Sequence, residues 1–248
     1  MYDHKTTSSA HYARILWMTG RPDTALELIW IRLEDVQRIG QPFAHGFFLV
    51  FAAIPISLWI GDSEAARRHV SSVLDVATGI ASYSVWWSMG DTYELVLKAL
   101  DNAGGPHSAV IGELLADKSL SPYVLDSLGT FSWPMVHPHA AAAASQGALH
   151  WCTAEILRAS AEGLLDSGEE RNRKEAERLL QRSIEVSRDQ NALSWELRSA
   201  TSLARLWRAE RRESQAKELL ASVYRKFTEG FATRDLLEAK ALLESFRA

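Results

Sequence analysis

The feature of this sequence that most constrains its fold is a short segment that recurs along the chain. Residues 16–25 (LWMTGRPDTA) recur as residues 58–66 (LWIGDSEAA) and again as residues 206–216 (LWRAERRESQA). A weaker fourth copy runs over residues 164–168 and reaches Ala176 after a charged insertion. In each copy we expect a Leu or Trp to end one helix, glycine or polar residues to form a turn, and a small alanine to begin the next helix. Each copy therefore predicts a helix–turn–helix packing unit.

The spacing of the copies indicates how long these helices are. Leu16 and Leu58 are 42 positions apart, and Ala176 and Ala216 are 40 apart, slightly more than the tetratricopeptide period of about 34 residues. Between the copies, apolar residues recur at helical spacing and strand-like alternation is not sustained. The predicted helices lie near residues 4–19, 23–39, 43–60, 63–78, 82–101, 107–118, 137–167, 172–190, 193–209, 213–228 and 233–246.

These helices predict an all-α fold, a tetratricopeptide-like α-solenoid of antiparallel helical hairpins. Residues 1–118 are interpreted as N-terminal helical repeats and residues 148–248 as C-terminal tetratricopeptide-like repeats. Residues 119–147 are expected to form an irregular connection, because the helical pattern fails over 119–136. We expect the parts to form one continuous solenoid.

Composition narrows the function classes. The net charge of -4 lacks the basic field of a nucleic-acid-binding protein, so no direct contact with nucleic acid is expected. The lone Cys152 and the absence of a leader-like start favour the cytoplasm. The apolar stretch 43–60 is interrupted by His45, Gly46 and Pro55, which favours a buried core helix over a membrane span.

Catalytic and metal-binding patterns are weak. The pair His137 and His139 is separated by a proline, which prevents the shared helical face that paired ligands usually need. Cys152 and His150 lack the local signature of a thiol nucleophile. The chain has no phosphate-binding loop ending in Lys-Ser or Lys-Thr. We therefore predict that the protein is not an enzyme and uses no cofactor or metal.

The middle of the chain holds the candidate binding residues. Residues 41–160 carry only 5 basic and 10 acidic side chains but five tryptophans, among them Trp133. Tyr83, Trp86 and Trp87 share one face of a predicted helix with Gly90, and aromatic side chains are favoured interface anchors. Two interpretations stay open: these rings fill the core, which is the more common outcome, or they line a groove for a ligand or peptide.

A second candidate surface is basic. Arg67 and Arg68 follow the second copy of the repeat and are placed to contact an acidic partner segment. A solvated helix face explains them equally well.

A resemblance to a known family adds to this interpretation. Residues 192–207 (ALSWELRSATSLARLW), 223–224 (VY), 227–231 (FTEGF) and 235–243 (DLLEAKALL) resemble the C-terminal tetratricopeptide-like region of large bacterial regulators. In those regulators a winged-helix or class III adenylate cyclase domain precedes a predicted ATPase module. Residues 2–20 and 40–43 look like an earlier part of the same region, whereas residues 102–147 match poorly. The resemblance implies a regulatory arm that receives a signal and passes it to an output domain.

The predicted function is non-catalytic recognition, in which the chain binds a protein or peptide partner within a bacterial signalling or transcription-regulatory system. Self-association is also possible, because the ends of a repeat array expose apolar surface. The alternative is a small-molecule sensor that holds an apolar ligand among Trp86, Trp87 and Trp133. An enclosed apolar pocket would favour the sensor, and an open groove with polar side chains would favour protein recognition.

Overall fold

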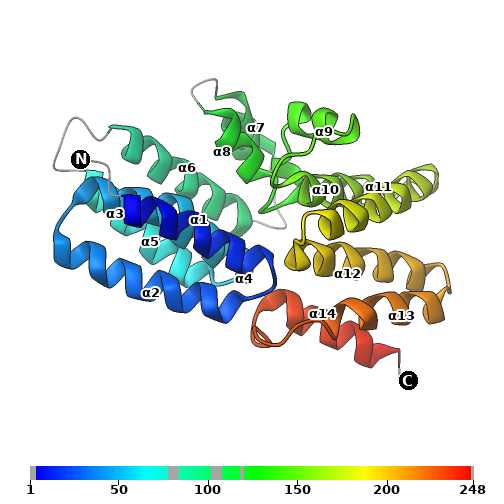
Figure 1. Cartoon of the computed structure of the whole chain (residues 1–248). Helices are drawn as coiled ribbons and strands as arrows, with labels where there is room; N and C mark the ends of the chain where they lie inside the picture. Colours follow the sequence, from blue (N-terminus) through cyan, green and yellow to red (C-terminus); the bar gives the residue numbers. More distant parts are fainter. Residues whose placement is uncertain (1–3, 78–83, 102–107, 118–119, 247–248) are drawn as a thin grey trace. The chain divides into compact units, whose positions relative to one another are not determined.

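The computed structural model (Figure 1) describes residues 4–77, 84–101, 108–117 and 120–246, with the backbone alone for residues 84–87 and 108. Every regular element in these ranges is helical, and none of the residues described there forms a strand. The prediction of an all-α fold is confirmed. The chain divides into two compact units, residues 1–17 with 21–116 and residues 18–20 with 117–248.

The first unit is built from helices that mostly pack on their neighbours along the chain, with α5 in contact with α3, α4 and α6. Its elements are α1 (His4–Met18), α2 (Pro22–Ile39), α3 (Pro42–Phe48), the π-helical turn η1 (Leu49–Ala53), α4 (Ile54–Ile60), α5 (Ser63–Ala77), α6 (Ser84–Asp101) and α7 (Ser108–Ala116).

One long apolar helix runs through the first unit. The segments α3, η1 and α4 are continuous over Pro42–Ile60, and the N–H of Ile54 bonds to the carbonyl of Leu49, five residues back. Pro55 has no N–H to donate, and the helix widens locally just before it. By length and composition alone this helix is able to cross a membrane, but 72% of its apolar window is buried inside the structure. The core helix of a soluble protein has the same properties.

The second unit contains the longest run of closely packed helices. Its elements are α8 (Pro122–Leu128), the 3-10 turn η3 (Trp133–Met135), α9 (Pro138–Ser145), α10 (Thr153–Asp166), α11 (Glu170–Asp189), α12 (Leu193–Ala209), α13 (Glu213–Tyr224) and α14 (Arg234–Ser245). Consecutive helices from α10 to α13 pack most extensively, and α12 also contacts both α10 and α14.

The sequence copies coincide with one kind of turn. In the copies at α1–α2, α4–α5 and α12–α13, a backbone N–H bonds to the carbonyl five residues earlier, at 2.9, 2.9 and 2.8 Å. The residue before each donor has a left-handed backbone, with φ of 84° at Gly20, 86° at Gly61 and 63° at Arg211. This arrangement satisfies carbonyls that the helix end leaves unpaired. Each copy therefore spans the end of one helix and the start of the next, as predicted.

The alanine of each copy is fully buried. Ala25, Ala66 and Ala216 lie five residues after the left-handed residue of their turn, and each is 0% exposed. Ala176, in the weaker copy with its insertion, is also 0% exposed. A side chain this small lets two helix backbones approach closely, which explains why alanine recurs at this position.

The tryptophans of the copies do not share one structural position. Trp17, Trp59 and Trp207 precede the left-handed residue of their turns by three, two and four positions. Trp17 and Trp59 are buried with ring centroids 4.6 Å apart, whereas Trp207 is half-buried and its Nε1–H donates to Glu177 at 2.6 Å. An alignment of the copies on Leu-Trp therefore shifts the turn of the second copy by one residue one way and that of the third copy by one residue the other way. The turn and the alanine define the repeat.

A further turn of this type is not visible as a copy. Between α11 and α12, the N–H of Ala192 bonds to the carbonyl of Ser187 at 2.8 Å and Asn191 has φ of 53°. The position five residues after Asn191 holds Glu196 instead of alanine. The Glu196 side chain is buried and pairs with Arg188 and Lys226, so an ion-paired carboxylate replaces the small residue.

The predicted helix over residues 137–167 was wrong, because the chain forms two helices there. Helix α9 ends at Ser145 and α10 begins at Thr153, and Gly147 between them has φ of 89°. Within residues 119–147, expected to be an irregular connection, the short elements α8, η3 and α9 occur.

Candidate functional site

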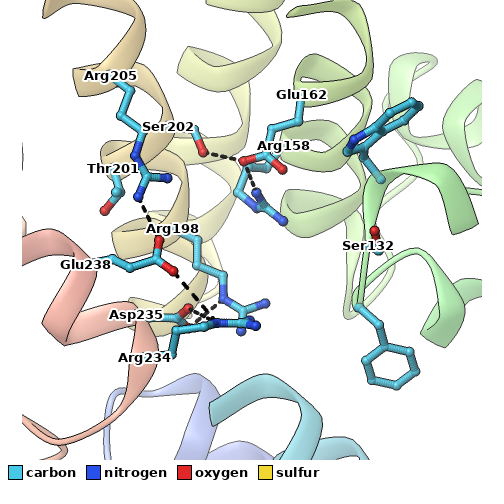
Figure 2. A pocket seen from close by; sticks show the side chains of 12 residues that line it. Ser132, Arg158, Glu162, Arg198, Thr201, Ser202, Arg205, Arg234, Asp235 and Glu238 are labelled. Carbon is cyan, nitrogen blue, oxygen red and sulfur yellow. Dashed lines mark hydrogen bonds and ion pairs between the residues drawn. The ribbon is translucent and has the colours of Figure 1, made fainter. Parts of the chain in front are cut away.

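The second unit contains a polar cavity of about 260 Å³. Helices α10, α12 and α14 and the segment 131–133 form its walls (Figure 2). Most of its lining side chains are charged or carry a hydroxyl group. The lining residues are Phe131, Ser132, Trp133, Arg158, Glu162, Arg198, Thr201, Ser202, Arg205, Arg234, Asp235 and Glu238.

A fully buried carboxylate, that of Glu155, binds two arginines that line this cavity. Glu155, Arg158 and Arg198 are called the floor of the cavity below. Glu155 is 0% exposed, and its Oε1 and Oε2 accept hydrogen bonds from Nη2 and Nε of Arg158 at 2.8 and 2.9 Å. Arg198 donates from Nη1 to the same Oε1 at 2.9 Å and from Nε to Oδ2 of Asp235 at 2.6 Å. One connected network therefore fixes side chains from α10, α12 and α14.

Ionic partners stabilise the charged forms of Arg158, Arg198 and Glu162. Burial alone lowers the pKa of Arg158, but the Glu155 and Glu162 carboxylates outweigh it and raise the pKa above its ordinary value. Burial likewise opposes the charge of Arg198, and Asp235 and Glu155 raise its pKa. For Glu162, burial raises the pKa, but Arg158 and a hydrogen bond from Ser202 at 2.8 Å hold it below the ordinary value. The cavity thus presents fixed charges of both signs at neutral pH.

The rim of the cavity is more loosely paired. Arg205 donates from Nη2 to Oε2 of Glu238 at 2.7 Å, and both side chains are exposed. Nε of Arg234 lies 3.8 Å from Oδ1 of Asp235 and 4.0 Å from Oε1 of Glu238. These separations exceed hydrogen-bond distance. Among the described residues, the Arg234 guanidinium therefore has ionic neighbours but no direct hydrogen-bond acceptor.

An aromatic side chain forms part of one wall. A Cβ added at Gly163 of α10 would lie 3.0 Å from the indole of Trp133, so the absent side chain lets this ring lie against the helix. Trp133 is nevertheless 37% exposed. It presents a partly exposed apolar surface beside the charged groups.

The aromatic binding residues predicted from the sequence do not all belong to one unit. Trp133 lines the polar cavity of the second unit. Tyr83 lies outside the described residues, and Trp86 and Trp87 lie on α6 of the first unit with side chains outside the described part. The apolar grouping of Trp86, Trp87 and Trp133 therefore stays a prediction.

Two neighbours of those aromatic residues belong to the core of the first unit. A Cβ at Gly90 would lie 2.7 Å from Cδ2 of Leu74, so this glycine serves the packing of α6 on α5. The hydroxyl of Tyr93 donates to the carbonyl of Val50 at 3.0 Å, and burial raises the pKa of this phenol. On the α6 positions whose side chains are described, the core interpretation therefore fits better than the groove.

The predicted basic surface lies on α5. Arg67 is exposed and pairs with both carboxylate oxygens of Asp101, at 2.5 and 2.6 Å. Arg68 is also exposed and pairs with Glu64 one turn earlier at 2.7 Å. Both pairs are compatible with the solvated-face interpretation, and partner contact there stays a prediction.

Among the histidine and cysteine candidates, His137 makes a local structural contact. Nδ1 of His137 accepts a hydrogen bond from the N–H of His139 at 3.2 Å and so caps α9. Cys152 is buried. In the described part of the chain, no group of three or more His, Cys, Asp or Glu side chains is arranged to hold a metal ion.

The cavity residues other than Trp133 were missed by sequence reasoning. A signal for them existed in α10, where Glu155, Arg158 and Glu162 follow helical spacing within an otherwise apolar and small-residue segment. Charges at i, i+3 and i+7 on one face indicate a paired cluster.

Comparisons with known proteins give no relative. No family model matches the chain, and neither the curated proteins nor the solved structures contain a significant match.

Proposed function

We propose that this chain is a non-catalytic, tetratricopeptide-like regulatory arm, and that the cavity of its second unit binds a segment of a partner protein. The repeated turn with its buried alanine supports the repeat architecture. So does the packing of α12 on both α10 and α14, because stacked hairpins bring alternate helices together.

The observation that carries the proposal is the contrast between the floor and the rim of the cavity. The floor charges are fixed by the Glu155 network, so they need little reorganisation when a ligand arrives. The rim offers exposed Arg205, Glu238 and Arg234 to solvent. An accessible polar surface with fixed charges is suited to recognition of another polar surface.

Acid–base catalysis is less well supported by the same groups. A general acid or base works best with a pKa near the operating pH. The pKa of Glu162 is shifted below its ordinary value, away from neutrality, by Arg158 and Ser202. The carboxylate is therefore suited to hold a charge and poorly suited to exchange a proton.

Within a regulator of the kind that the chain resembles, occupation of this cavity would transmit a signal through α14. Asp235 and Glu238 on α14 pair with Arg198 and Arg205 on α12. A ligand that competes for these arginines would change the contact between the two helices and favour one arrangement of the arm.

Site-specific photocrosslinking tests the proposal. A benzophenone amino acid replaces Trp133 at the cavity, and in a matched control it replaces Glu185 on α11, which does not line the cavity. Irradiation of cells that naturally express the protein should give a discrete protein adduct at position 133 and none at 185. The adduct should disappear with Arg234→Glu. Equal labelling at both positions, or no protein adduct at 133, would contradict the proposal.

A further inference from the structure

The hydrogen-bonding capacity of the cavity is unevenly used. On α14, the Arg234 guanidinium has no acceptor within hydrogen-bond distance among the described residues. A guanidinium carries five N–H donors and binds a carboxylate through two of them in parallel. Arg234 is therefore the cavity group best prepared to bind an incoming acidic group.

A complementary vacancy exists on α10. Oε1 of Glu162 accepts from Arg158 and from Ser202. In the described structure, no hydrogen bond reaches its other oxygen, Oε2. Figure 2 shows Glu162 and Arg234 coming from different helices on different sides of the cavity. Glu162 therefore offers a free acceptor for a cationic group.

The charge balance of the cavity indicates which kind of ligand binds both Arg234 and Glu162. The lining and floor hold four arginines, which are Arg158, Arg198, Arg205 and Arg234, and four acids, which are Glu155, Glu162, Asp235 and Glu238. A ligand with a charge of only one sign would unbalance these charges and would leave either Arg234 or Oε2 of Glu162 without an ionic partner. A ligand carrying one charge of each sign preserves neutrality and satisfies both Arg234 and Glu162.

The size of the cavity limits what enters. Ligand pockets for drug-sized molecules usually measure about 300–1,000 Å³, whereas this cavity measures about 260 Å³. The ends of two neighbouring side chains fit such a volume better than a large cofactor does.

We infer that the partner segment carries an acidic and a basic side chain close together, the acid bound by Arg234 and the base by Glu162. The inference rests on the proposed function and specifies its ligand. The partly exposed ring of Trp133 gives the aliphatic stem of the basic side chain an apolar surface to lie against.

The test uses short peptides of defined charge. Alanine–glycine peptides, blocked at both ends and labelled with an uncharged fluorophore, contain one Lys and one Glu separated by zero to four residues. Analogues replace the Lys, the Glu or both with Gln. Fluorescence anisotropy should show that the best doubly charged peptide binds at least tenfold more tightly than either singly charged analogue.

Variants of the protein test which residue binds the Glu of the peptide and which binds the Lys. Arg234→Gln should remove the advantage given by Glu, and Glu162→Gln the advantage given by Lys. Arg171→Gln, an exposed change on α11, is the control and should change neither. If a variant fails to fold, as checked by circular dichroism, the comparison of peptides on the unaltered protein still decides the question.

Four outcomes would overturn the inference. Equal binding of the Glu-only analogue would indicate an anion site, and equal binding of the Lys-only analogue a cation site. No advantage of any charged peptide over the neutral one would exclude ionic recognition. Competition with free glycine tests whether the ligand is a small zwitterion instead of a protein segment. Displacement of the labelled peptide by glycine at a lower concentration than by unlabelled peptide would exclude a protein segment. If the peptides fail while the adduct at position 133 persists, the ligand assignment falls but recognition stands.

Discussion

Arg198 donates a hydrogen bond from Nη1 to Oε1 of Glu155 at 2.9 Å, across 43 positions of sequence. Both side chains are buried, and the pair joins α12 to α10 at the cavity, which Arg198 lines. Two charges removed from water are tolerated only where each has partners. This contact therefore links the stability of the second unit to the charge pattern of the cavity.

Removing the negative charge of Glu155 should strongly destabilise the second unit. Glu155→Gln keeps the shape but removes the buried charge that Arg158 and Arg198 share, and leaves each of them a single carboxylate partner, Glu162 or Asp235. Breaking a buried pair costs about 3–5 kcal/mol. Urea unfolding should show a loss of about 3 kcal/mol. The control is Glu175→Gln, whose partner Arg178 is exposed, and it should cost less than about 1 kcal/mol. Similar losses in both variants would mean that the buried network contributes no more than a surface pair.

The turn after α12 offers a stabilising change. Arg211 adopts φ of 63°, a conformation that glycine adopts at the equivalent positions Gly20 and Gly61. Arg211→Gly should raise the free energy of unfolding by about 0.5–1 kcal/mol, because glycine has no steric penalty in the left-handed region. Denaturant titration checks this value.

The matched control for that change is Lys217→Gly, an exposed position within α13. There glycine should cost about 1 kcal/mol, because the backbone is helical and glycine is a poor helix former. A destabilising Arg211→Gly would show that the Arg211 side chain has a role outweighing its backbone strain.

The sequence predicts the local units of this fold better than their pairing. The turn and alanine of each copy are local, because the left-handed residue and Ala25, Ala66 or Ala216 lie five positions apart. The tryptophans misled the alignment because a large ring reaches the core from several positions of a helix end. The turn before Glu196 was missed because an ion pair replaces the expected alanine there.

The cavity was missed for a different reason. Arg198 has its partners at Glu155 and Asp235, 43 and 37 positions away. A single sequence does not say which distant acid an arginine meets, so the partners of Arg198 were not predicted. Only Trp133 was singled out in advance, as an aromatic residue in a charge-poor region, and it lies at the edge of the polar site.

The buried alanine of the repeat should resist enlargement. Ala216 is 0% exposed at the start of α13. Ala216→Leu should cost about 1–3 kcal/mol, since the added isopropyl group forces neighbouring helices apart. Leu and Ala have similar helix propensities, so the loss reports packing. The neighbouring exposed Gln215→Leu should change stability by less than about 0.5 kcal/mol, and urea midpoints compare the two.

The histidines of the first unit should make its stability depend on pH. Burial lowers the pKa of His45 below its ordinary value of 6.5, and Nε2 of this ring is buried without a hydrogen-bond partner among the described residues. Burial also lowers the pKa of His69, and the charges of Arg68 and His45 add to this effect while Asp62 opposes it. The folded protein therefore binds fewer protons than the unfolded chain just below pH 6.5.

The sign of the effect follows from that difference in proton binding. The stabilisation is fully present above the unfolded pKa of about 6.5 and declines as pH falls from there through the lowered native pKa values. Urea midpoints measured from pH 8 to about pH 5.5 should therefore fall. His45→Gln combined with His69→Gln should flatten the decline, because glutamine does not titrate. A slope in the double variant as steep as in the unaltered protein would place the pH dependence elsewhere.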